Sequence, residues 1–183
     1  LNGTTNYILT KMIKEGLSFD TALAQAQEKG YAEADPTADV EGFDACRKIC
    51  ILASLSFGRH IYPAQVPTQG ITGITSEDVA LAEAAGMKIK LLGRAVRQED
   101  GKGVAPHLIP EDQQLAGVED VFNGIVVRGD AIGDVMFYGR GAGKLPTASA
   151  VSADIIDAVK HKERRQNMDW DLGGDDVVGD FTA

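Results

Sequence analysis

The spacing of apolar and polar residues changes about halfway along the chain. In the first half, apolar residues recur every three or four positions, the spacing of one helix face. This pattern predicts four helices, over residues 4–16, 18–30, 44–58 and 75–86. Asn2 or Thr4 can cap the first, Ser18 the second, and Gly16 and Gly30 stand at their C-terminal ends. The last begins with the capping-box-like pair Thr75 and Asp78.

The second half favours strands. Runs rich in branched and aromatic residues cover 89–98, 103–109, 122–129 and 133–139, and short Gly- and Asp-containing turns separate the first pair and the last pair. A Gly-rich loop then opens a closing helix, with Pro146 near its first turn. Helices followed by an antiparallel meander predict an α+β fold, with a predominantly antiparallel or mixed β-sheet and helices packed on one face.

Two parts of this pattern carry further expectations. The helix over 44–58 is apolar almost all round, so we expect it to be buried. Its cysteines, Cys46 and Cys50, lie one turn apart, which is a poor geometry for a disulfide. We expect both to be reduced and buried, in a cytosolic protein. Residues 161–183 are polar and weakly patterned, which is typical of a tail or linker and leaves 1–160 as the folded domain.

Composition narrows the classes of function. The 183 residues carry a net charge of −9, which disfavours nucleic-acid binding because that needs a basic surface. No apolar run approaches the roughly 20 residues that cross a bilayer. The chain begins at Leu1 with no secretory leader, so we expect a cytoplasmic protein and a piece of a longer one.

Acidic residues gather between Gly30 and Lys48, namely Glu33, Asp35, Asp39, Glu41 and Asp44. The spacing does not match an EF-hand, so we predict no metal site. A solvated loop is one reading, and a site for a cationic group such as an amine is the other.

Asp44 and Lys48 are spaced i, i+4 on a predicted helix and share a face. They are either a surface ion pair or a pocket pair in which the lysine can donate a proton to an alkoxide. The glycine loop at 139–143 does not match a P-loop, because Tyr138 stands where a glycine is needed. It is either a tight turn or a place where backbone approaches a ligand closely.

Together, four stretches resemble homoserine dehydrogenases: LNGTTNYIL, GYAEADPTADVEGFDACRK, IKLLG and YGRGAGKLPTASAV. The resemblance covers roughly residues 1–160 and implies the substrate-binding and dimerisation domain, without the family's nucleotide-binding domain. It implies NAD(P)H-dependent interconversion of L-aspartate 4-semialdehyde and L-homoserine, in threonine, methionine and isoleucine biosynthesis. The cofactor, NADP or NAD, would be held mainly by the absent domain, so this chain alone is expected to be inactive and to form homodimers.

The resemblance also implies roles for individual residues. Lys48 matches the family's catalytic lysine, and Asp44 the aspartate that places substrate and lysine. Substrate-binding positions correspond to Glu33, Asp39, Tyr31, Gly3 and Thr4. Gly141 and Gly143 match the loop that approaches the cofactor. A non-catalytic amine-binding module and a purely structural dimerisation domain remain the alternatives.

Overall fold

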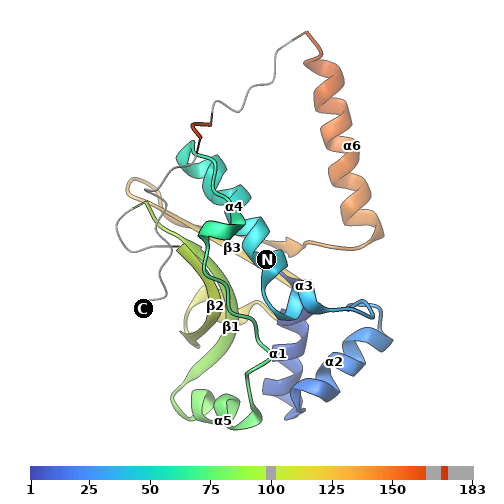
Figure 1. Ribbon diagram of the computed structural model, residues 1–183, viewed down its shortest axis with the longest axis vertical. Helices are drawn as coiled ribbons and strands as arrows, with labels where there is room; N and C mark the ends of the chain where they lie inside the picture. The colour runs from blue at the N-terminus through green and yellow to red at the C-terminus, as the bar shows by residue number, and fades with distance from the viewer. Residues whose placement is uncertain (98–101, 164–169, 173–183) are drawn as a thin grey trace.

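The computed structural model describes residues 1–97, 102–163 and 170–172, and the fold is α+β, as the sequence predicts (Figure 1). The helices are α1 Gly3–Glu15, α2 Phe19–Glu28, α3 Thr37–Val40, α4 Phe43–Phe57, α5 Ser76–Ala84 and α6 Lys144–Lys160, with short 3-10 turns at Pro63–Gln65 and Gln114–Gly117. The strands are β1 Met87–Ala95, β2 Lys102–Pro110, β3 Phe122–Gly129 and β4 Gly133–Arg140.

Local capping chemistry sets the ends of the first helices. The Asn2 side chain caps α1 by accepting from the Thr5 amide, and Gly16 ends that helix in a left-handed conformation at φ 64°. Ser18 caps α2, and Thr75 and Asp78 form the predicted capping box of α5. The sequence predictions for these three helices are confirmed.

The strands do not form one sheet. They make two separate antiparallel hairpins, β1–β2 and β3–β4, so the predicted single meander is wrong in this respect. The outer edge of β2 is already paired, because Val104 exchanges backbone hydrogen bonds with Pro67 and Gln69. Residues 111–121, including a 3-10 turn, then carry the chain away before β3 begins.

Two apolar clusters hold the body together. The first joins α1, α2, α5 and β1 around the fully buried Ile8, Leu9 and Ile71. The second joins α4 to β2 and includes Cys46, Cys50 and Val104. Both cysteines are buried and neither forms a disulfide, as predicted.

Helix α4 is buried along one face only. Ala45, Cys46 and Ala53 face the core, whereas Ile51 and Leu55 are 56% and 52% exposed. The prediction that this helix is buried all round is therefore wrong for the chain by itself. An apolar sequence shows that a surface needs covering, but it does not show which part of the protein covers it.

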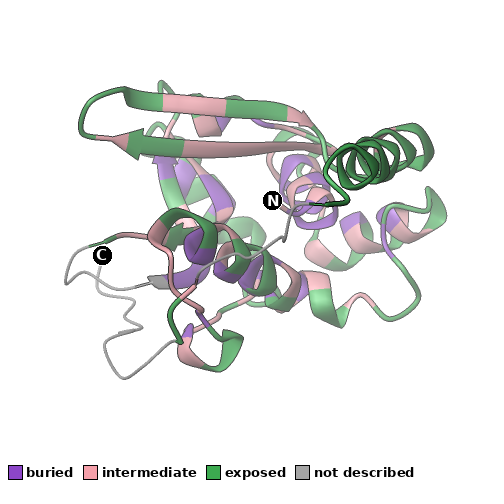
Figure 2. Ribbon diagram, turned by 90° about the horizontal axis from the view of Figure 1, so that it is seen from above, coloured by how far each residue is buried: buried purple, intermediate pink, exposed green. Residues whose placement is uncertain are grey.

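Helix α6 projects away from the rest of the molecule, and none of its residues is buried (Figures 1 and 2). Beyond it, residues 170–172 lie against the end of α4: the Asp171 amide donates to the Gly58 carbonyl at 3.0 Å, and the His60 amide donates to the Asp171 carbonyl at 2.9 Å. This short part of the predicted tail is therefore hydrogen-bonded to the body. The remainder of 161–183, apart from 161–163, lies outside the described residues.

Candidate functional site

The acidic stretch is folded rather than a plain loop. Residues 37–40 form α3, and Gly42, at φ 81°, turns the chain directly into α4. A left-handed φ favours glycine, so the turn between the two helices depends on this residue. The turn places Asp39 and Asp44 on the same side, next to the start of α1.

Asn2 connects these two carboxylates. Its Nδ2 donates to Asp39 Oδ1 at 2.6 Å and to Asp44 Oδ2 at 2.8 Å, while its Oδ1 accepts from the amide of Thr5 at 2.9 Å. Only 7% of Asn2 is exposed. One buried amide therefore fixes two acids from the acidic stretch against the first turn of α1.

Lys48 extends this cluster by one helical turn. Its Nζ lies 2.6 Å from Asp44 Oδ2 and donates to the Leu1 carbonyl at 3.0 Å. Its side chain is 46% exposed, so the ammonium is held in place yet reachable by a ligand. Of the two sequence readings, the pocket pair fits this arrangement better than an isolated surface ion pair.

A cavity of about 380 Å³ opens between this lysine and the β3–β4 hairpin. Lys48, Leu1 and Gly3 line one wall, and Asn123, Tyr138 and the backbone of residues 139–142 line the other. Residues that are far apart in sequence, Gly3, Lys48 and Gly141, thus face one space. A cationic proton donor at the wall of a cavity can stabilise and protonate an anionic oxygen.

Three of the predicted substrate residues, Thr4, Tyr31 and Glu33, lie away from this cavity. The Thr4 hydroxyl donates to the Tyr31 carbonyl at 2.7 Å, and the Tyr31 ring packs against Tyr7 with centroids 5.1 Å apart. Glu33 is exposed, and its carbonyl accepts from Gln27. The structure connects Thr4 with Tyr31, but Glu33, Tyr31 and Thr4 do not line the cavity. Asp39, Asp44 and Gly143 do not line it either.

The glycine loop passes close to β3. A Cβ on Gly141 would lie 2.7 Å from Nδ2 of Asn123, the end of a side chain that can move aside. Gly143 has φ 121° and is followed by α6. The loop is therefore both a tight turn and a wall of the cavity.

Two further polar residues, Asn2 and Lys90, were not predicted as site residues. The sequence indicates Asn2 only as a helix cap, since nothing in its neighbourhood points to two acceptors 37 and 42 positions away. Lys90 is 5% exposed, and burial lowers its pKa to about 8. In the sequence, the only indication that Lys90 is buried is its position inside the apolar run IKLL.

Among the described residues, no group of three or more His, Cys, Asp or Glu side chains is arranged to hold a metal ion. No helix in the described part of the chain has the length and apolarity needed to cross a membrane.

Comparison with known proteins identifies the family of this chain. The homoserine dehydrogenase family model matches residues 1–156. The homoserine dehydrogenase of Synechocystis is 52% identical over 165 residues, which is 87% of this chain and 38% of that protein. The enzyme from Bacillus subtilis is 44% identical over 98% of this chain and 40% of its own length. The chain belongs to the homoserine dehydrogenase family and spans well under half the length of these relatives.

Solved structures agree. The homoserine dehydrogenase of Thiobacillus denitrificans superposes with a TM-score of 0.86 at 45% identity, covering 98% of this chain and 42% of that one. The S. aureus enzyme gives 0.84 at 47% identity, covering 91% and 43%. A hyperthermophilic archaeal homoserine dehydrogenase mutant, solved in complex with NADPH, gives 0.72 at 33% identity over 87% of this chain and 45% of its own. The predicted family and fold class are confirmed.

Proposed function

We propose that the protein carrying this chain interconverts L-aspartate 4-semialdehyde and L-homoserine with NAD(P)H, and that this chain supplies substrate binding and proton transfer. The observation that carries the proposal is Lys48, held by Asp44 at the wall of the cavity that Gly3 and Gly141 also line. Membership of the homoserine dehydrogenase family supports this reaction, for which such a lysine is suited. Under this proposal, residues 1–160 are the catalytic domain and 161–183 are a tail or linker.

Bound NAD(P)H would supply the hydride that reduces the aldehyde carbon. The aldehyde oxygen then becomes an alkoxide, and Lys48 donates it a proton from Nζ. In the reverse direction the neutral Lys48 amine accepts the proton of the homoserine hydroxyl. Asp44 keeps Nζ in position, since the two groups are only 2.6 Å apart.

Substrate recognition is assigned to the acidic residues and their neighbours. The substrate carries an ammonium group, which carboxylates bind by charge-assisted hydrogen bonds. Glu33 and Asp39 are proposed for this role, with Tyr31, Thr4 and Gly3 bordering the substrate. Asp39 is the one of the two acids that the structure fixes, through Asn2.

The loop at Gly141 and Gly143 is proposed to approach the cofactor, whether NADP or NAD, from this domain. Gly141 lines the cavity, and the absence of a side chain there leaves its backbone open to close approach by a ligand. Most of the cofactor would be held by a further domain, so the isolated chain should show no turnover.

The partner is proposed to be a second copy of the same protein. Ile132, Phe137 and Val127, on or between the strands of the β3–β4 hairpin, are 68%, 61% and 42% exposed, more apolar surface than one hairpin usually leaves in water. Sedimentation of the full-length protein as a monomer at micromolar concentration would contradict the homodimer. We further propose a cytoplasmic location and no membrane partner. We also propose no nucleic-acid partner, consistent with the net charge of −9.

The reaction is tested with the full-length protein by following NADPH absorbance with two aldehydes. Succinic semialdehyde differs from aspartate 4-semialdehyde only in lacking the ammonium group, so it is the matched control. We expect kcat/KM to be at least about 10²-fold higher for the aminated aldehyde, because a site that pairs a charged group strongly rejects an analogue without it.

Equal rates with the two aldehydes would contradict ammonium recognition. Binding of homoserine without any turnover would favour the alternative of a non-catalytic amine-binding module. Dimerisation with neither binding nor turnover would favour a structural domain.

A further inference from the structure

Lys90 is a lysine enclosed within the body of the protein. It lies in β1 with 5% of its surface exposed, and its Nζ donates to Asn6 Oδ1 at 3.0 Å and to the Val118 carbonyl. Fully buried lysines are rare unless they are paired. Its position is not explained by packing, since an apolar side chain of similar volume would avoid the desolvation cost.

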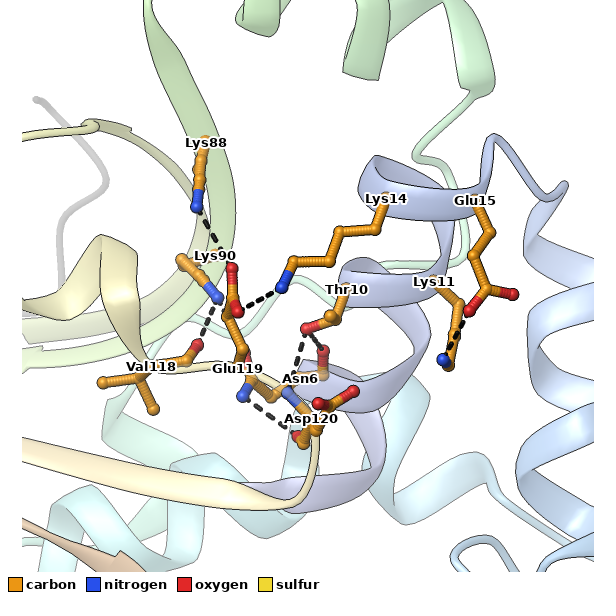
Figure 3. A network of polar contacts seen from close by, with 10 residues as sticks. All are labelled: Asn6, Thr10, Lys11, Lys14, Glu15, Lys88, Lys90, Val118, Glu119 and Asp120. Atoms are coloured by element: carbon orange, nitrogen blue, oxygen red, sulfur yellow. Dashed lines mark hydrogen bonds and ion pairs between the residues drawn. The ribbon is translucent and has the colours of Figure 1, made fainter.

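Both acceptors lead to the same place in the fold. Val118 begins the segment that enters β3, and Asn6 Nδ2 donates to the carbonyls of Asp120 and Phe122 at 3.0 and 3.2 Å in that segment. Figure 3 shows Lys90 pointing at Val118, with Asn6 and Asp120 close by. Lys90 and Asn6 thus bind residues 118–122 from two elements, β1 and α1.

Further polar groups converge on the same segment. Glu119 pairs with Lys14 of α1 at 2.5 Å and with Lys88 of β1 at 3.2 Å (Figure 3). The Asp120 amide donates to the Thr10 hydroxyl at 3.1 Å. Asp120 has φ 52°, a backbone conformation that non-glycine residues rarely adopt unless their surroundings hold it.

This junction anchors the β3–β4 hairpin. Among the described residues, no ladder hydrogen bond joins β3–β4 to β1–β2. The position of the hairpin therefore depends on its entry segment, and the hairpin carries Asn123 and the backbone around Gly141 to one wall of the cavity. The opposite wall begins one turn before Asn6, whose amide donates to the Asn2 carbonyl at 3.2 Å.

We propose that Lys90 is a positioning residue: by binding Asn6 and Val118 it sets the β3–β4 hairpin, and the Gly141 loop with it, against the Lys48 wall of the cavity. Its significance for catalysis rests on the function proposed above. Lys90 itself touches no reacting group. It acts on cofactor placement through the hairpin.

The test compares Lys90→Met with Lys88→Met in the full-length protein. Lys88 is the matched control, a lysine of the same strand that reaches this segment only through its ion pair with the solvent-accessible Glu119, a contact worth little, and that bonds to neither Asn6 nor Val118. Hydrogen exchange is measured over residues 118–123. We expect Lys90→Met to accelerate it about tenfold or more, the effect of losing a net hydrogen bond on local opening, and Lys88→Met to change it less than about threefold.

Steady-state kinetics supply the second readout. In Lys90→Met, the KM for the cofactor should rise about tenfold while the KM for homoserine stays within about threefold, since the hairpin wall is displaced and the acidic residues are not. A KM for homoserine that rises as much as that for the cofactor would overturn selective positioning.

Unchanged exchange over 118–123 in Lys90→Met overturns the proposal whatever the activity. Absence of turnover in the wild type would instead refute the proposed function, while the exchange comparison would still decide the structural role. If Lys90→Met fails to fold, Asn6→Ala takes its place, because it removes the Lys90–Asn6 bond together with the Asn6 bonds to Asp120 and Phe122. Unchanged exchange in that variant would show that the Lys90–Asn6 contact does not hold the segment, and would overturn the proposal.

Discussion

Replacing Asn2 by alanine should destabilise the chain more than the loss of an ordinary helix cap. The cap itself, from Asn2 Oδ1 to the Thr5 amide, is worth about 1 kcal/mol. The two Nδ2 bonds to Asp39 and Asp44 have charged acceptors, for which a net value of about 1.5–3 kcal/mol each applies when they are buried. Because water can reach both carboxylates, we assign about 1.5 kcal/mol to the two bonds together, the lower end of the range for one buried bond. The expected loss is about 2–3 kcal/mol.

Urea unfolding of the chain measures this loss, and Asn2→Ser separates its parts. Serine keeps a capping oxygen but has no amide group to bridge the two carboxylates. We expect Asn2→Ser to lose about 1–2 kcal/mol and Asn2→Ala about 1 kcal/mol more. If Asn2→Ala unfolds within about 0.5 kcal/mol of the wild type, the bridge between Asp39 and Asp44 contributes nothing and the reasoning is wrong.

Three further predictions concern other parts of the chain. Thr75→Ala should lower the free energy of unfolding in urea by about 1 kcal/mol, because it removes the capping box with Asp78, and no change would contradict the cap. Gly141→Val should raise the cofactor KM of the full-length protein about tenfold by placing a branched side chain on the cavity wall proposed to approach the cofactor, and an unchanged KM would remove the loop from the cofactor site. The pKa of Lys90 is about 8 in the folded protein and 10.5 ordinarily. Between pH 8 and pH 10.5 the lysine is therefore protonated in the unfolded chain but largely neutral in the folded one. The free energy of unfolding consequently rises with pH over this range, by up to about 3 kcal/mol. Urea titrations at pH 7.5 and 10 should show this rise in the wild type relative to Lys90→Met, and parallel curves would contradict it.

The ends of α1, α2 and α5 were predictable because their signals are local. Ser18 bonds to Thr21, and Thr75 to Asp78, three residues away in each case. Such contacts depend little on the rest of the fold. Helix periodicity and capping chemistry therefore agreed with the structure here.

The features that the sequence did not indicate are non-local. The bridge from Asn2 to Asp39 and Asp44 spans 37 and 42 positions, and the Lys90–Asn6 bond spans 84. The separation of the strands into two hairpins follows from the pairing of β2 with residues 67–69, which have no strand pattern of their own. Alternation within a strand predicts its faces but not its neighbours.

The candidate site was predictable only through the family resemblance. Spacing alone placed Asp44 and Lys48 on one helix face, which the 2.6 Å pair confirms, but left a surface ion pair as an equal reading. The cavity wall opposite Lys48 comes from residues 123–142, and no local pattern connects those residues to position 48.

The most direct test of the proposed mechanism is the rate of Lys48→Met in the full-length protein, with Arg47→Met as the matched loss of a neighbouring exposed cation. NADPH oxidation with aspartate 4-semialdehyde is followed under saturating substrate. We predict that kcat falls about 10²-fold or more in Lys48→Met, the usual contribution of a general acid, with the KM for substrate little changed, while Arg47→Met stays within about threefold of the wild type. Equal kcat values for Lys48→Met and the wild type would show that Lys48 is structural and that the proton comes from another group.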